Sequence, residues 1–162
     1  MGLMETANCY MESLDLLEQF AAQARDFERT FVDDEWSRLE RYFTTDVIYE
    51  TLGDGGERFA GRPVMLAALR RSVTNFDRRC DSRLLVTTRG PFLGPAEVCR
   101  HWSCEFAVSG APDLTIEGTE RAVYRGDLIE LLQEALTPAS RANLNAWLAA
   151  YGQFLKPIKR ET

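Results

Sequence analysis

Apolar and polar side chains alternate over a long stretch of the chain, from Glu97 to Ala135. An alternation with a period of two residues is typical of β-strands that bury one face. Two groups of turn-forming residues interrupt it, at positions 109–113 and at Gly126-Asp127. We therefore predict three consecutive antiparallel strands, at Glu97 to Val108, Leu114 to Tyr124 and Leu128 to Ala135.

The same alternation predicts which side chains of these strands face the interior. If the five-residue turn sets Val108 opposite Leu114, the aromatic side of the first strand and the apolar side of the second coincide. The first strand then contributes Trp102, Cys104, Phe106 and Val108, and the second contributes Leu114, Ile116, Gly118, Glu120, Ala122 and Tyr124. This inner face is apolar apart from one carboxylate.

The third strand can be aligned with the second through its short turn. Hairpins favour two-residue turns, and such a turn at Gly126-Asp127 sets Glu120 opposite Gln133. A shift by one residue would point Glu130 and Glu134 inward, so we prefer the first alignment. It makes Gln133 the polar neighbour of Glu120.

Helical periodicity precedes and follows the strands. A long first helix is predicted from about Met11 to Phe31, and Asp33-Asp34 end it and begin a shorter second helix. Further along the chain we expect a strand from Asp46 to Thr51, a turn over 52–56, a short strand at Arg58-Phe59, a helix over 63–75, a strand from Asp81 to Arg89, a loop over 90–95 and, after the three strands, a last helix from Thr137 to Leu155.

Helices outside an unbroken antiparallel run of strands indicate an α+β fold. We expect a cone: a curved, mostly antiparallel sheet wrapped on the long N-terminal helix, with an extra C-terminal helix and one open mouth where a ligand binds. The 162 residues suit a single domain over 1–162, with its core at about 12–136 and the C-terminal helix at 137–155.

The composition and net charge of the chain limit the kinds of binding partner that we expect. The net charge of -6, without a basic run, argues against nucleic acid or an anionic membrane, and no apolar stretch approaches the ~20 residues of a spanning helix. The N-terminus lacks the features of a signal peptide. The four cysteines show neither metal-ligand spacing nor a pairing in reach, so we interpret them as reduced thiols and expect a cytoplasmic protein.

The order of elements and several local patterns resemble the SnoaL-like branch of the nuclear-transport-factor-like superfamily, which has the cystatin-like α+β fold. The resemblance is carried by the residues at 36–50, 59–62, 110–120 and 125–129. It implies the cone-shaped fold and a homodimer that pairs through the outer face of the sheet. That face is expected to carry charges of both signs together with Leu128 and Leu132.

Within this superfamily, the ketosteroid isomerases offer a comparison by position. Their catalytic base is an aspartate that follows a glutamate, whereas Thr51 follows Glu50 here. Phe27 stands where those enzymes have the tyrosine of the oxyanion hole, and Glu120 stands where they have a neutral, hydrogen-bond-donating aspartate. The resemblance therefore carries over one of three functional groups and disfavours steroid isomerisation.

Glu120 is the candidate catalytic residue. Burial among aromatic side chains would raise its pKa and make it a general acid or base near neutral pH. The alternative is that Glu120 forms an ion pair with Arg100 or a buried polar link with Gln133, in which case its role is structural.

The candidate ligand-binding residues share the inner face with Glu120. They are Tyr49, Thr51, Arg100, Trp102, Phe106, Tyr124 and Gln133. The alternative for Tyr49 and Thr51 is a purely structural role in the core and at the end of a strand. His101, the sole histidine, is expected on the outer face, so neither a metal site nor a nucleophile–histidine pair is predicted.

Two functions remain open. The first is an enzyme with an apolar pocket for a small hydrophobic or carbonyl-containing molecule, a cofactor-independent isomerase, cyclase or dehydratase that uses Glu120. The second is a non-catalytic, dimeric ligand-binding or assembly module of the same fold. A pocket that reaches Glu120 from solvent would favour the enzyme, and a closed interior filled with aromatic side chains would favour the module.

Overall fold

The computed structural model describes residues 2–159, with side chains from Asp15 onward. Its elements are α1 (Gly2–Asp33), η1 (Trp36–Tyr42), β1 (Phe43–Thr51), β2 (Arg58–Ala60), α2 (Arg62–Asn75), η2 (Asp77–Arg79), β3 (Ser82–Gly94), β4 (Glu97–Ala107), β5 (Leu114–Arg125), β6 (Leu128–Leu136), α3 (Pro138–Tyr151) and η3 (Gly152–Phe154), where η marks a 3-10 helix. Among the described helices, none is long and apolar enough to cross a membrane.

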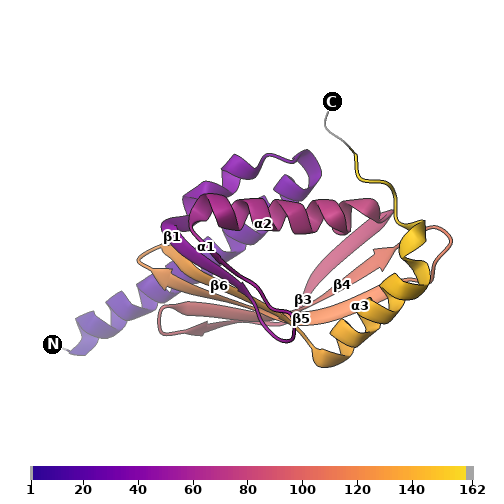
Figure 1. Cartoon of the computed structure of the whole chain (residues 1–162). Coiled ribbons are helices and arrows are strands. Elements are labelled where there is room, and N and C mark those ends of the chain that lie inside the picture. The colour runs from indigo at the N-terminus through magenta and orange to yellow at the C-terminus, as the bar shows by residue number, and fades with distance from the viewer. Residues whose placement is uncertain (1, 160–162) are drawn as a thin grey trace.

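The strands form one sheet in the order β2-β1-β6-β5-β4-β3. The β1–β6 pair is parallel, and the other neighbours are antiparallel. In Figure 1 the sheet curves beneath α2, with α1 behind it and α3 at the end of the molecule opposite the N-terminus. The predicted α+β cone, with a curved sheet, a long first helix and an extra C-terminal helix, is therefore confirmed.

The pairing of β4 with β5 preserves the predicted faces but differs in register. Phe106, not Val108, lies opposite Leu114, which shifts the pairing by two residues. Because side chains alternate with a period of two, this shift leaves every inner residue on the inner face. Along β5 the residues at even positions from Leu114 to Tyr124 are all buried, as the alternation indicated.

The predicted pairing of β5 with β6 is wrong beyond its turn. The turn itself is as expected, with Tyr124 opposite Ile129, but the register then shifts so that Val123 faces Leu131. The extra residue in this β-bulge is Glu130, which turns outward and lies 3.6 Å from Nε of Arg125. A bulge of one residue exchanges the two faces for the remainder of the strand.

The bulge decides which polar residues of β6 face the interior. Glu134 becomes the inward-facing partner of Glu120, and Gln133 moves to the outer face. Leu132, which we expected on the outer face, is 2% exposed and belongs to the core. The chain thus turns Glu134 inward while keeping Glu130 at the surface, a combination that a uniform register could not produce.

The segment at 90–95, which we expected to be a loop, mostly continues β3. The strand runs on to Gly94, and Phe92 pairs with Cys99 of β4. Gly90 and Pro91 disturb the ladder only locally, since the register shifts between Arg89 and Phe92. Proline is tolerated because β3 lies at the edge of the sheet, where one side of the backbone needs no strand partner.

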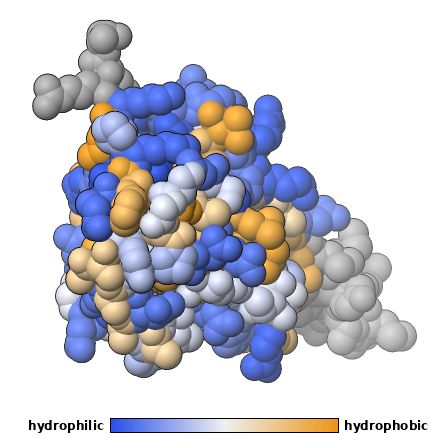
Figure 2. All heavy atoms as spheres, turned by 90° about the vertical axis from the view of Figure 1, so that its right-hand side faces the viewer, coloured by the Kyte–Doolittle hydropathy of each residue, from blue (hydrophilic) through white to orange (hydrophobic). Residues whose placement is uncertain are grey.

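The helix α3 is fixed at its start and at its centre. The Thr137 hydroxyl caps it by accepting from Ser140 N at 3.1 Å, as the sequence predicted. Trp147 is 5% exposed, and its Nε1 donates to the Pro112 carbonyl at 2.8 Å. Figure 2 looks onto this end of the molecule, where apolar and charged side chains are interspersed. The predicted apolar stripe therefore packs on the body in part, while Leu148 stays 36% exposed.

Candidate functional site

A cavity of about 600 Å³ lies between the inner face of the sheet and the three α-helices. Its volume is within the range of small-molecule sites. Most of its walls are apolar, formed by Phe27, Leu69, Val73, Phe76, Leu85, Trp102, Phe106, Ile116, Leu132 and Leu144. Gly55, Glu57 and Thr87 also line it and are exposed, so the cavity is open to solvent.

Glu120 lies in this cavity as half of an ion pair. The Nε and Nη2 atoms of Arg100 lie 2.8 and 2.6 Å from its Oε2. Arg100 also reaches the Thr87 hydroxyl at 3.3 Å, and its guanidinium lies over the Phe20 ring at 5.4 Å from the centroid. The ion pair that was the structural alternative for Glu120 is therefore present, but Glu120 also lines the cavity, where a ligand can contact it.

Glu134 is the carboxyl of the cavity wall that lies next to Glu120. It lies deep in the molecule, with part of its surface facing the cavity, directly across the β5–β6 pair from Glu120. The Tyr49 hydroxyl donates to its Oε2 at 2.9 Å. Burial and then the charge of Glu120 raise the pKa of Glu134 from 4.5 to about 7, against the opposing effects of Tyr49 and Arg100.

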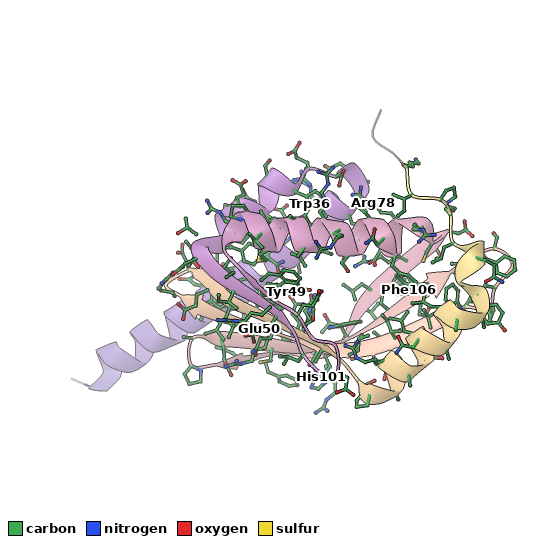
Figure 3. All side chains as sticks on the ribbon, viewed as in Figure 1. Trp36, Tyr49, Glu50, Arg78, His101 and Phe106 are labelled. Atoms are coloured by element: carbon green, nitrogen blue, oxygen red, sulfur yellow. The ribbon has the colours of Figure 1, made fainter. Side chains whose placement is uncertain are left out.

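The hydroxyl of Tyr49 is held as a donor. Burial, together with the neighbouring Glu134 carboxyl, raises the phenol pKa above its ordinary value, so Tyr49 keeps its proton. Its ring stacks on Phe59 with centroids 5.8 Å apart, which fixes its direction. Figure 3 shows Tyr49 and Phe106 in the space between α2 and the sheet, with Glu50 pointing away from it.

The two carboxyls differ in what they can do. Directly opposite residues of an antiparallel pair have Cβ atoms about 5 Å apart, so both side chains can reach one small molecule. Glu120 is paired with Arg100, whereas the raised pKa of Glu134 lets it hold a proton near neutral pH. Two neighbouring carboxyls in such different environments are a usual basis of an acid–base pair.

A second charged group lines the cavity at another point. Arg83 is 6% exposed at its side chain and pairs with Asp77 and Glu28, each at 2.8 Å. Its guanidinium also lies 4.8 Å from the centroid of the Phe31 ring. Burial raises the pKa of Asp77, and Arg83 opposes that effect. Arg83 lies four residues before Thr87 on β3, or about 13 Å along the strand, so this cluster is separate from Arg100.

No group of three or more His, Cys, Asp or Glu side chains that could hold a metal ion occurs among the described residues.

Comparisons with solved structures identify the architecture. An NTF2-like protein of unknown function from Burkholderia pseudomallei K96243 has a TM-score of 0.63 at 10% identity and covers 80% of this chain and 96% of that one. The chain has the nuclear-transport-factor-like fold. An LEH-like epoxide hydrolase from M. tuberculosis (0.60, 15% identity, 88% and 98% covered) and Bal32a from a soil-derived mobile gene cassette (0.61, 14%, 84% and 98%) are also similar. No family model and no curated protein sequence matches.

This nuclear-transport-factor-like fold brings most of the predicted site residues to one cavity. Tyr49, Thr51, Arg100, Trp102, Phe106 and Glu120 all line it. Tyr124 is buried on the same face, but it is not part of the cavity wall, and its hydroxyl has no hydrogen-bond partner in the described structure. His101 lies on the outer face, as predicted, with its ring 6.3 Å from that of Phe92 (Figure 3).

Gln133 is the predicted site residue that the structure places elsewhere. It lies on the outer face, donates to Glu50 at 2.7 Å and accepts from Arg121 at 3.0 Å. The bulge at Glu130 is the cause, because it exchanges Gln133 for Glu134 on the inner face. Sequence reasoning considered an inward Glu134 only as part of a uniform shift and therefore missed it.

Proposed function

We propose that this protein is a cofactor-independent acid–base enzyme that acts on a small, mostly apolar molecule carrying a carbonyl or similar polar oxygen. The observation that carries the proposal is the pair of inward carboxyls in one open cavity, with Glu120 held by Arg100 and Glu134 able to keep its proton near neutral pH. The open cavity favours this function over the non-catalytic module.

In the proposed mechanism, the protonated Glu134 donates a hydrogen bond to the substrate oxygen as negative charge develops there. Tyr49 orients that carboxyl through its hydroxyl. The Glu120 carboxylate accepts the proton that leaves the substrate carbon or a water molecule. Arg100 positions Glu120 through contacts from two of its nitrogens. Isomerisation, cyclisation and dehydration next to a carbonyl all use such a proton transfer.

A second candidate reaction is the hydrolytic opening of an epoxide. It is favoured by the combination of a carboxylate, an arginine and a carboxylic acid in one cavity, since water must lose a proton while the epoxide oxygen gains one. The fold similarity to an LEH-like epoxide hydrolase is in keeping with it. The two candidates use the same residues and differ in whether a water molecule or a carbon atom gives up the proton.

We also infer that the protein works as a homodimer in the cytoplasm. The outer face carries a polar row across five strands, which links Glu97, Arg121, Gln133, Glu50 and Arg58. Such a mixed surface suits a wet interface. The unpaired cysteines of the described chain, Cys80, Cys99 and Cys104, are in keeping with a reducing compartment.

The test is a screen of the purified protein in deuterated water with a panel of enolisable bicyclic ketones, and in ¹⁸O-labelled water with a panel of aryl epoxides. Mass spectrometry reports label incorporation. We expect incorporation in one panel, lost at least 100-fold in both Glu134→Gln and Glu120→Gln. Glu130→Gln, on the same strand but at the surface, is the matched control. Incorporation that survives in Glu134→Gln would contradict the assignment.

A further inference from the structure

Gln23 of α1 is a buried polar residue of the cavity that the proposed reaction does not use. It is 4% exposed, and it lines the cavity. Its Oε1 atom is buried and has no hydrogen-bond partner among the described residues. A buried amide oxygen without a partner has lost its hydrogen bonds to water without replacement, which makes such groups rare in folded proteins.

The position of Gln23 places it on the helical wall near the carboxyl pair. It lies one helical turn after Phe20, whose ring packs against the Arg100 guanidinium that holds Glu120. The other residues of α1 that line the cavity are Ala24, Arg25, Phe27 and Glu28, of which Arg25 and Glu28 are exposed. Gln23 is thus the buried polar residue of this wall, one turn from the ring that packs on Arg100.

The charged groups of the cavity indicate which kind of ligand the Gln23 amide can bind. Its buried guanidinium groups are already occupied, Arg100 by Glu120 and Arg83 by Asp77 and Glu28. The remaining arginines of the lining, Arg25 and Arg141, are not buried, so an anionic ligand deep in the cavity would gain no free buried cation and would meet carboxyl groups instead. The Gln23 atom without a partner is the amide oxygen, which accepts hydrogen bonds, so it complements a neutral hydroxyl group that can donate one.

We propose that Gln23 is the specificity-determining residue of the cavity, whose amide oxygen accepts a hydrogen bond from a hydroxyl group of a neutral, largely apolar ring compound. This inference rests on the proposed function for the presence of a substrate in the cavity. The role inferred for Gln23 differs from the proposed catalysis. Gln23 on α1 discriminates between ligands, whereas the carboxyls on β5 and β6 transfer the proton. The missing hydrogen bond of Gln23 is then made by the ligand.

The test compares two probes of nearly equal shape, 2-naphthol and 2-methylnaphthalene, by equilibrium dialysis at pH 6. We expect wild-type protein to bind 2-naphthol at least tenfold more tightly. Gln23→Met keeps the length of the side chain and removes the amide, so it should bring the ratio to about one without weakening 2-methylnaphthalene. Gln19→Met makes the same change one turn earlier on α1, outside the cavity wall, and should keep the preference.

Stability gives a second readout. Replacement of an unpartnered buried amide by an apolar side chain should raise the melting temperature of Gln23→Met by a few degrees, whereas loss of a structural hydrogen bond would lower it. If Gln23→Met does not fold, Gln23→Asn withdraws the same amide by one methylene and should also lose the preference.

An unchanged ratio in the Gln23 variants overturns the inference, as does wild-type protein that binds neither probe or both alike. Neither probe reacts, so failure of the label-exchange screen leaves this result unaffected, and the two proposals fail separately.

Discussion

Replacement of Glu134 by glutamine tests the central feature of the site without any knowledge of the substrate. In the native protein the pKa of Glu134 is about 7, against 4.5 for an ordinary glutamate. Between these two values the folded chain keeps a proton that the unfolded chain has lost, so the free energy of unfolding falls as the pH rises through this window. Below pH 4.5 both states are protonated, and Glu134 contributes no pH dependence.

The magnitude follows from the size of the pKa shift. A difference of about 2.5 pH units corresponds to about 3 kcal/mol at 1.36 kcal/mol per unit, and this is an upper limit because part of Glu134 faces the water of the cavity. Glutamine resembles the protonated acid and does not titrate. The variant should therefore match wild type at pH 4 and be more stable by about 1–3 kcal/mol at pH 8.5.

Urea unfolding followed by tryptophan fluorescence at pH 4, 5.5, 7 and 8.5 measures this difference. The pH dependence of the other carboxyls largely cancels between the two proteins. Glu130→Gln removes a surface carboxylate from the same strand and controls for the change in net charge. A Glu134→Gln variant whose stability difference from wild type is the same at pH 4 and pH 8.5 would show that Glu134 titrates as an ordinary glutamate, and the acid role should then be abandoned.

Three further outcomes are expected. Arg100→Met should destabilise the protein by about 3–5 kcal/mol in thermal unfolding at pH 7, because it leaves the buried Glu120 carboxylate unpaired, and a loss below 1 kcal/mol would mean that water replaces the arginine. Trp147→Ala should cost about 3–5 kcal/mol, and a chain that ends at Leu136 should aggregate; a stable, soluble truncation would contradict the packing of α3. Light scattering should report a dimer at micromolar concentration that Arg121→Glu weakens, and a wild-type monomer would exclude it.

The α+β cone could be predicted because its evidence is repeated at many positions. The alternation along β5 places every even residue from Leu114 to Tyr124 inside. The N-cap Thr137 and the proline that follows it locate the start of α3. A register error of two residues between β4 and β5 does no harm to such a prediction, since it preserves the face of each side chain. A prediction that rests on such a repeated pattern is not changed by an error at one position.

The prediction of the candidate site depended instead on a single residue, the extra Glu130 of the β-bulge. Whether the hairpin of β5 and β6 contains a bulge is decided by tertiary packing: Leu132 gains a place in the core, Glu130 reaches Arg125, and Thr51 of the parallel strand β1 pairs with Glu134. None of these partners is adjacent in sequence. The preference for an apolar inner face, which usually identifies the register, favoured the wrong alternative because the Glu134 carboxyl lies on that face.

Several interactions that oppose stability lie in the wall of the cavity, although Thr44, Arg78 and Tyr124, which lie outside that wall, also carry buried polar atoms without a partner among the described residues. Two carboxyls opposite each other on neighbouring strands repel, and the fold accommodates them through Arg100 on one and a retained proton on the other. The unpartnered amide of Gln23 lies in the wall of the same cavity. A core selected for stability alone would carry leucine or methionine at these positions. Departures from local consistency that converge on one open cavity are expected where a ligand supplies the missing partners, and this convergence supports a binding site more strongly than any one of the residues alone.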